Sequence, residues 1–157
     1  MRRFLAIGVV LVVAAGALLW WWVHRPSDRQ LVDELIARAV HGVETKSLDE
    51  IMGCVSPGYH DEEGLSKLDV WRGAARFVQS PDTAEVSIED YTLDIAPPKA
   101  TGVFRVRVVI LQNGQYLNLG PMEMTVEFEK RRRRLRQVWL VKSVSAEGID
   151  RLMRGYM

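Results

Sequence analysis

The chain opens with an uncharged apolar run over residues 4–23, from Phe4 to Val23. A helix of that length would span about 30 Å, the thickness of the hydrocarbon core of a bilayer. Two arginines precede the run, and Trp20, Trp21 and Trp22 close it, where an interfacial aromatic belt would lie. The pattern predicts a signal anchor, a single transmembrane helix that ends with a short linker at residue 26.

A cleavable signal peptide is the alternative to a retained anchor. Ala15-Gly16-Ala17 has the small-x-small form of a cleavage site, and the apolar stretch before it is long enough. Cleavage after Ala17 would expose two leucines and three tryptophans at a free terminus, which favours retention. Because the leading tail is short and basic, we expect a cytoplasmic N-terminus and an extracytoplasmic domain on an inner or plasma membrane, although Arg25 and Arg29 lie beyond the run.

The pattern then changes to that of amphipathic helices. Apolar residues recur every three or four positions between Leu31 and Val43, and Ser27 precedes them as a helix cap. Two shorter helices are predicted to begin after Ser47 and Ser66, each followed three residues later by an acidic side chain, as in a capping box. The domain is therefore predicted to start with three helices.

From residue 84 the apolar positions recur with a period of two, which is typical of strands with one buried face. Pro97-Pro98 ends the first strand, and residues 103–111 form the second. The last strand, over residues 137–145, is apolar on both sides around Trp139, so its inward face stays open. The pattern predicts a sheet of four antiparallel strands.

The turn between the second and third strands is predicted at Asn113-Gly114, a strong signal for a two-residue hairpin. This turn sets Ile110 opposite Leu117. The apolar positions from Met124 onward are even-numbered, whereas Leu117 is odd-numbered, and a slip of one residue turns every side chain to the other face. We therefore predict a β-bulge at Gly120-Pro121.

Two motifs carry a resemblance to a known superfamily. They are Ser56-Pro57-Gly58-Tyr59-His60-Asp61-Glu62-Glu63-Gly64 and Trp139-Leu140-Val141. Three helices around the first motif, followed by a long-stranded sheet that ends with the second, resemble the nuclear-transport-factor-2-like (SnoaL-like, cystatin-like α+β) superfamily. The resemblance covers nearly all of residues 28–148. It implies an α+β fold in which a curved sheet wraps the helices into a cone with a pocket at its open end.

The superfamily includes isomerases, dehydratases and assembly proteins, so the fold alone does not define the function. In its ketosteroid-isomerase-like enzymes a carboxylate near the position of Asp61 can act as general base, and a tyrosine as oxyanion donor. The resemblance implies these roles for Asp61 and Tyr59, with His60 beside them, if the domain is an enzyme. The alternative is a loop in which the tyrosine packs and the acidic side chains are solvated.

Charge is distributed unevenly along the chain. The net charge is +1, but six of the 21 basic residues lie within residues 130–136, between the last two predicted strands. This segment is expected either to be a solvated hairpin tip or to contact anionic lipid headgroups or an acidic protein. Nucleic acid is not expected as a partner, because no aromatic residues interleave with the cations. The candidate contact residues are Lys130, Arg131, Arg132, Arg133, Arg134 and Arg136.

Other chemistry has little support in the sequence. Cys54 is the only cysteine, so no intrachain disulfide forms, and the three histidines lack metal-ligand spacing. We expect no metal and no cofactor. The main hypothesis is a non-enzymatic, membrane-anchored binding or assembly module over residues 27–157, with a homodimer through the sheet as one arrangement. The alternative is a pocket-based small-molecule binder or an isomerase- or dehydratase-like enzyme that uses Asp61 and Tyr59.

Overall fold

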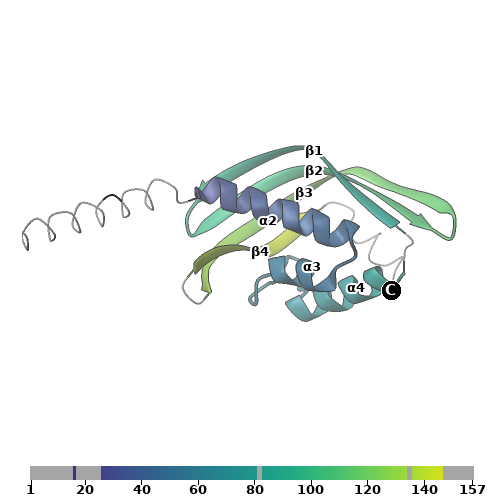
Figure 1. The fold of residues 1–157 in the computed structure, drawn as a ribbon, viewed down its shortest axis with the longest axis horizontal. Coiled ribbons are helices and arrows are strands. Elements are labelled where there is room, and N and C mark those ends of the chain that lie inside the picture. Colours follow the sequence, from purple (N-terminus) through teal and green to yellow (C-terminus); the bar gives the residue numbers. More distant parts are fainter. Residues whose placement is uncertain (1–15, 17–25, 81–82, 134–135, 147–157) are drawn as a thin grey trace, which may run out of the picture.

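The computed structural model describes Gly16 and residues 26–80, 83–133 and 136–146 (Figure 1). The helices are α2 (Asp28–Glu44), α3 (Leu48–Cys54) and α4 (Lys67–Gln79). The strands are β1 (Thr83–Ala96), β2 (Lys99–Gln112), β3 (Gln115–Arg133) and β4 (Arg136–Ala146). Apart from Gly16, the predicted anchor over residues 4–23 lies outside the described residues. Within the part that is described, no helix is long and apolar enough to cross a membrane.

Each helix begins at the serine that the sequence predicts. The Ser27 hydroxyl accepts a hydrogen bond from the Gln30 amide at 3.2 Å, and the Gln30 side chain accepts one from the Ser27 amide at 2.8 Å, which forms a capping box. Ser47 caps α3 through the Glu50 amide. At the start of α4 the acidic residue of the predicted box accepts hydrogen bonds from both the amide and the hydroxyl of Ser66.

The four strands form one antiparallel sheet in the order β1-β2-β3-β4. The predicted turn at Asn113-Gly114 is confirmed, since Ile110 lies opposite Leu117. Both turn residues have positive φ, 52° and 75°, as a type I′ turn requires. β2 begins at Lys99, four residues earlier than the sequence indicates, because the turn after β1 is tight.

The predicted bulge is also confirmed. Val106 lies opposite Met122 and Val108 lies opposite Leu119, so a single residue of β2 faces both Gly120 and Pro121. The sheet has two further register shifts, one in β1 between Ile88 and Asp90 and one in β4, and the shift in β4 was not predicted. The shift falls at the residue after Val141, so that the inward face passes to Val144.

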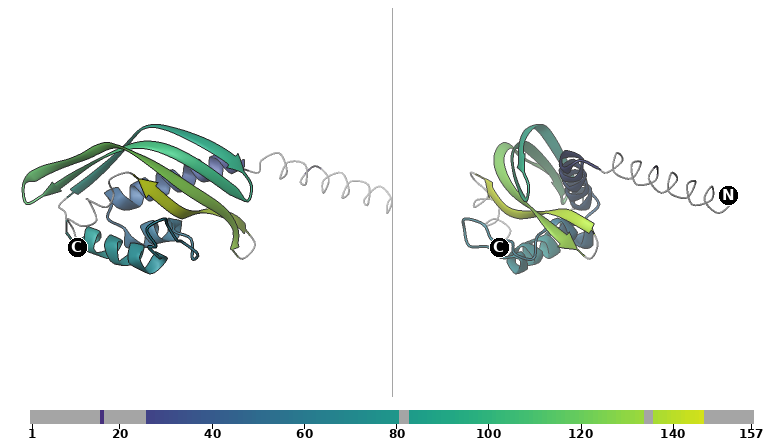
Figure 2. Two further views of the ribbon diagram at one scale, coloured as in Figure 1. Left: turned by 180° about the vertical axis from the view of Figure 1, so that it is seen from behind. Right: turned by 90° about the vertical axis from the view of Figure 1, so that its left-hand side faces the viewer.

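The sheet curves around α2, which lies along its concave face (Figures 1 and 2). α3 packs against α2 and β4, and α4 packs against α3. From α2, Val32 and Leu35 are almost fully buried against Phe104, Phe128 and Trp139 of the sheet. The cone implied by the resemblance is therefore present at the level of the fold.

Candidate functional site

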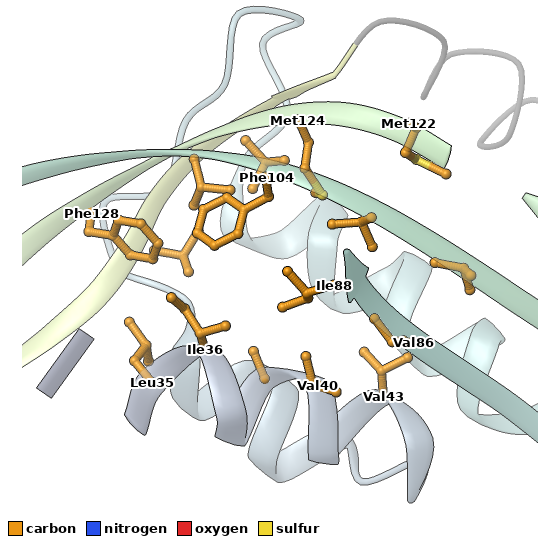
Figure 3. A pocket seen from close by; sticks show the side chains of 16 residues that line it. Leu35, Ile36, Val40, Val43, Val86, Ile88, Phe104, Met122, Met124 and Phe128 are labelled. Atoms are coloured by element: carbon orange, nitrogen blue, oxygen red, sulfur yellow. The ribbon is translucent and has the colours of Figure 1, made fainter. Parts of the chain in front are cut away.

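A cavity of about 300 Å³ lies between α2 and the concave face of the sheet (Figure 3). The side chains around it come from α2 and from all four strands. No charged or hydrogen-bonding side chain is among the sixteen lining residues. They are Leu35, Ile36, Ala39, Val40, Val43, Val86, Ile88, Phe104, Val106, Val108, Met122, Met124, Val126, Phe128, Val141 and Val144.

The cavity is closed at one end and open at the other. Leu35, Phe104 and Phe128, beside the first half of α2, are buried, whereas Val43 and Val86, beside its C-terminal end, are partly exposed. Figure 3 shows these two groups at opposite ends of the cavity. The mouth therefore lies near the C-terminal end of α2.

Aromatic rings close the inner end. The Phe104 ring stacks on Tyr91 with centroids 5.5 Å apart and meets Phe128 edge-on at 6.2 Å. Gly102 makes room for this arrangement, because a Cβ at that position would lie 2.4 Å from the Phe104 ring. The closed end is thus rigidly packed, and a guest molecule would enter from the side of Val43.

The structure brings Tyr59 and Asp61 together, but not at the cavity. The Tyr59 hydroxyl donates to the Asp61 carboxylate at 3.3 Å, and both side chains are buried. Neither is among the residues that line the cavity. His60 is exposed, and its amide donates to the Lys142 carbonyl, which attaches this loop to the edge of β4.

Asp61 organises the loop that contains it. Its carboxylate accepts hydrogen bonds from the amides of Glu63 at 3.1 Å and Leu65 at 2.7 Å. Burial, with the neighbouring Asp61 charge, raises the pKa of Tyr59 to about 12, so its phenol keeps its proton. The pair therefore fits a buried loop support better than the general base and oxyanion donor that the resemblance implies.

A second polar network joins this loop to β3. The fully buried Ser56 hydroxyl donates to the Glu129 carboxylate and accepts from the Gly58 amide at 3.0 Å. Arg131 forms an ion pair with Glu129 at 2.6 Å. Because Ser56 also donates its amide to the Val141 carbonyl, the segment covers the otherwise free edge of β4.

The structure divides the basic segment into two groups. β3 continues to Arg133 and β4 begins at Arg136, so most of these cations are strand residues rather than a solvated tip. Lys130 faces inward and forms a 2.6 Å ion pair with Asp28, which also accepts a 3.0 Å hydrogen bond from the Trp139 indole. Arg131 is paired as above. Arg132, Arg133 and Arg136 are exposed, and Arg134 lies outside the described residues.

The ion pair between Asp28 and Lys130 predicts that the stability of the domain depends on pH. The hydrogen bond from the Lys130 ammonium holds the pKa of Asp28 below its ordinary 3.8, and the Trp139 indole adds to this effect while burial opposes it. A carboxyl group whose pKa is lower in the folded state than in the unfolded state stabilises the fold at pH values above its unfolded-state pKa. We expect Asp28→Asn to destabilise the domain by about 1–2 kcal/mol at neutral pH.

That difference should shrink as the pH falls below 3.8 and through the folded-state pKa, because the wild-type carboxylate is then protonated too. Denaturant unfolding at pH 7 and pH 3 would measure it. Asp49→Asn, at an exposed position in α3, is the control and should change stability little. A deficit for Asp28→Asn that is equal at both pH values would contradict the role of the ion pair.

The described part of the chain contains no candidate site for metal binding or for thiol chemistry. No group of three or more histidine, cysteine or acidic side chains is close enough to hold a metal ion there. Cys54 is buried, and burial raises the pKa of its thiol, so it is a packing residue.

No protein-family model and no curated protein sequence matches this chain. Solved structures do resemble it. A nuclear-transport-factor-2-like superfamily protein from Salmonella enterica serovar Typhimurium superposes with a TM-score of 0.62 at 12% identity, over 74% of this chain and 87% of that one. A proposed dehydratase of the same family from Streptomyces avermitilis gives 0.58 at 11% identity, over 76% and 94%.

A proposed scytalone dehydratase from Novosphingobium aromaticivorans gives a TM-score of 0.59 at 6% identity, over 76% of this chain and 82% of the other. At these identities the likeness is one of fold. The chain therefore has the nuclear-transport-factor-2-like α+β fold that its motifs resemble.

The cavity lining was not recognised as a site from the sequence, although its elements were visible there. The apolar stripe of α2 and the even-numbered apolar positions of β3 read as ordinary core. These residues line a cavity rather than a filled core because the curved sheet holds its concave face away from α2.

Proposed function

We propose that the domain binds a compact apolar molecule, or the hydrocarbon part of a larger one, in the cavity between α2 and the sheet. The observation that carries this proposal is a lined, open cavity without a titratable group. At about 300 Å³ it is at the small end of the range of ligand pockets. Each buried methylene of a guest would contribute about 0.8 kcal/mol. Recognition would thus depend on shape and apolar area.

The proposal favours binding over catalysis. General acid–base work needs a side chain within hydrogen-bond reach of the reacting atom. Asp61 and Tyr59 are not at the cavity wall, and the carboxylate is engaged by two backbone amides. The proposed dehydratases among the structural neighbours support an enzyme as the second candidate. That candidate requires Asp61 to reach the cavity, which the loop hydrogen bonds oppose.

We also propose that residues 4–23 tether the domain to a membrane, with the domain on the extracytoplasmic side. Length, the leading arginines and the closing tryptophans support this part. An acidic protein partner and a homodimer are further proposals, for which the described residues supply no contact.

Filling the cavity tests the proposed binding. Ala39 lines the cavity, whereas Ala37, on the same helix, is exposed. With the full chain in nanodiscs, titration with naphthalene, a neutral apolar probe, should shift the methyl NMR signals of Ile36 and Ile88 in a saturable way. Ala39→Phe should abolish these shifts, because the new ring occupies the space, and Ala37→Phe should retain them.

Melting temperatures of the two variants serve as the folding control. Shifts that persist in Ala39→Phe, or that spread over surface methyls, would refute cavity binding. Asp61→Asn should leave the shifts unchanged if binding does not use the carboxylate. Turnover of a bound probe that is lost in Asp61→Asn would favour the enzyme instead.

A further inference from the structure

The basic hairpin, defined by the described residues 130–133 and 136, lies beside the start of α2, directly after the linker from the apolar run. Lys130 and Trp139 hold Asp28 at 2.6 and 3.0 Å, on either side of the hairpin turn. The Lys130 ammonium also lies 5.9 Å from the centroid of the Trp139 ring. Figure 1 shows the end of β3 and the beginning of β4 at the same end of the domain as the beginning of α2.

The basic hairpin carries more positive charge than its surroundings neutralise. Asp28 and Glu129, the two acidic partners at its base, are already engaged by Lys130 and Arg131. Within the described part of the chain, no ion pair is formed by the exposed Arg132, Arg133 or Arg136.

Two of these arginines also oppose each other directly. Arg133 and Arg136 are cross-strand partners, and like charges in that position are destabilising. Arg133 additionally contributes to lowering the pKa of Lys67, after the larger effect of burial. The repulsion between the Arg133 and Arg136 side chains destabilises the hairpin on its own, and an anionic surface beside them would reduce this repulsion.

We propose that the basic hairpin docks on anionic lipid headgroups of the same membrane in which residues 4–23 are anchored. The docking rests on the tether proposed above. Only four residues separate Val23 from Asp28, so even a fully extended linker places the start of α2 at most about 17 Å from the end of the apolar run. Because the tether holds the basic hairpin close to the bilayer, lipid headgroups are present at a high local concentration. A free acidic protein partner has no such advantage.

Docking fixes the orientation of the cavity. Phe128, at the closed end, lies two residues before Lys130 on β3, whereas Val43, near the mouth, lies at the C-terminal end of α2. With the hairpin on the headgroups, the mouth faces away from the bilayer. The domain would then accept an apolar ligand from the aqueous side or from a partner there, rather than directly from its own membrane.

Single-site labels can measure this docking in the full chain. The native cysteine, Cys54, is buried, so a cysteine introduced at an exposed position takes the label. Gln137 is exposed beside the hairpin turn, and Tyr116, 78% exposed, lies at the tip of the β2–β3 hairpin. A fluorophore at each position would be quenched by neutral acrylamide, in nanodiscs of phosphatidylcholine alone and in nanodiscs with added phosphatidylglycerol.

We expect phosphatidylglycerol to protect the label at Gln137→Cys and to leave the label at Tyr116→Cys unchanged. Each arginine near such a surface strengthens association by about fivefold. The triple variant R132Q/R133Q/R136Q should therefore lose the protection, and high salt should reduce it for the wild type. The variant R38Q/R72Q/R76Q removes the same charge from α2 and α4 and should keep the protection.

Each other outcome counts against the proposal in a distinct way. Equal quenching at Gln137→Cys in both kinds of nanodisc, with the chain inserted, would overturn the docking and leave the tether standing. Protection in both kinds of disc, or protection that survives the triple variant, would show that the basic hairpin does not recognise anionic lipid. A chain that does not insert would overturn tether and docking together, without bearing on the cavity.

Discussion

Replacing Phe128 by alanine is expected to destabilise the domain by about 3–5 kcal/mol, the range for truncating a large buried side chain. Phe128 is 2% exposed, meets the Phe104 ring edge-on and closes the inner end of the cavity. The space it leaves would merge with the existing cavity, so the neighbouring side chains cannot collapse around it. Urea unfolding followed by tryptophan fluorescence would measure the loss.

Tyr116→Ala is the control, because that ring is exposed and its truncation should change stability by about 0.5 kcal/mol or less. A loss below about 1 kcal/mol for Phe128→Ala would mean that the closed end is not the rigid core described above. The same variant enlarges the cavity. If the proposed binding is correct, it should therefore accept a longer apolar probe than the wild type does.

Replacing Gly120 by alanine is expected to destabilise the domain by about 2–4 kcal/mol. Gly120 has a φ of 120°, a conformation that other residues rarely adopt. A Cβ there would lie 2.7 Å from the Val106 carbonyl oxygen and 3.2 Å from the Arg107 Cα, both of them backbone atoms that cannot turn away. The bulge would have to reopen, and the register of β2 against β3 would be strained.

Gly114→Ala separates backbone strain from steric overlap. That glycine also has a positive φ, 75°, but nothing lies within 4 Å of its added Cβ, so we expect a cost of about 1 kcal/mol. Gly73→Ala, inside α4 with open space around it, should stabilise the domain by up to about 1 kcal/mol. Equal losses at Gly120 and Gly114 in urea unfolding would rule out the overlap.

Bulge and turn were predictable because they follow from local rules. Asn113-Gly114 sets the pairing, and the change of parity before Met124 requires one extra residue. The serine caps are local in the same way. The bulge in β4 was not predictable, because apolar side chains on both sides of Trp139 fit either inward face. At this bulge the loop that begins at Ser56 is bonded to β4, because the amides of Ser56 and His60 donate to the carbonyls of Val141 and Lys142.

The roles of the candidate residues depend on tertiary contacts that the spacing of residues in the sequence does not reveal. Tyr59 and Asp61 lie two residues apart in the sequence and are hydrogen-bonded to each other in the structure, yet neither lines the cavity. Lys130 reads as one of six equivalent cations, but its position on the inner face of β3 brings it to Asp28. The free positive charge is therefore smaller than the sequence indicates, and it is concentrated at the turn.

The sequence by itself determined the α+β class, the three helix starts, the hairpin register and the bulge at Gly120-Pro121. These depend on caps, periodicity and turn chemistry within a few residues of each other. The tertiary structure alone decided that the cavity is apolar throughout, that Asp61 lies outside it, and that the basic hairpin lies beside the start of α2. Each of these depends on how a curved sheet holds distant segments together, and hydrophobic pattern does not encode the distance between two apolar faces.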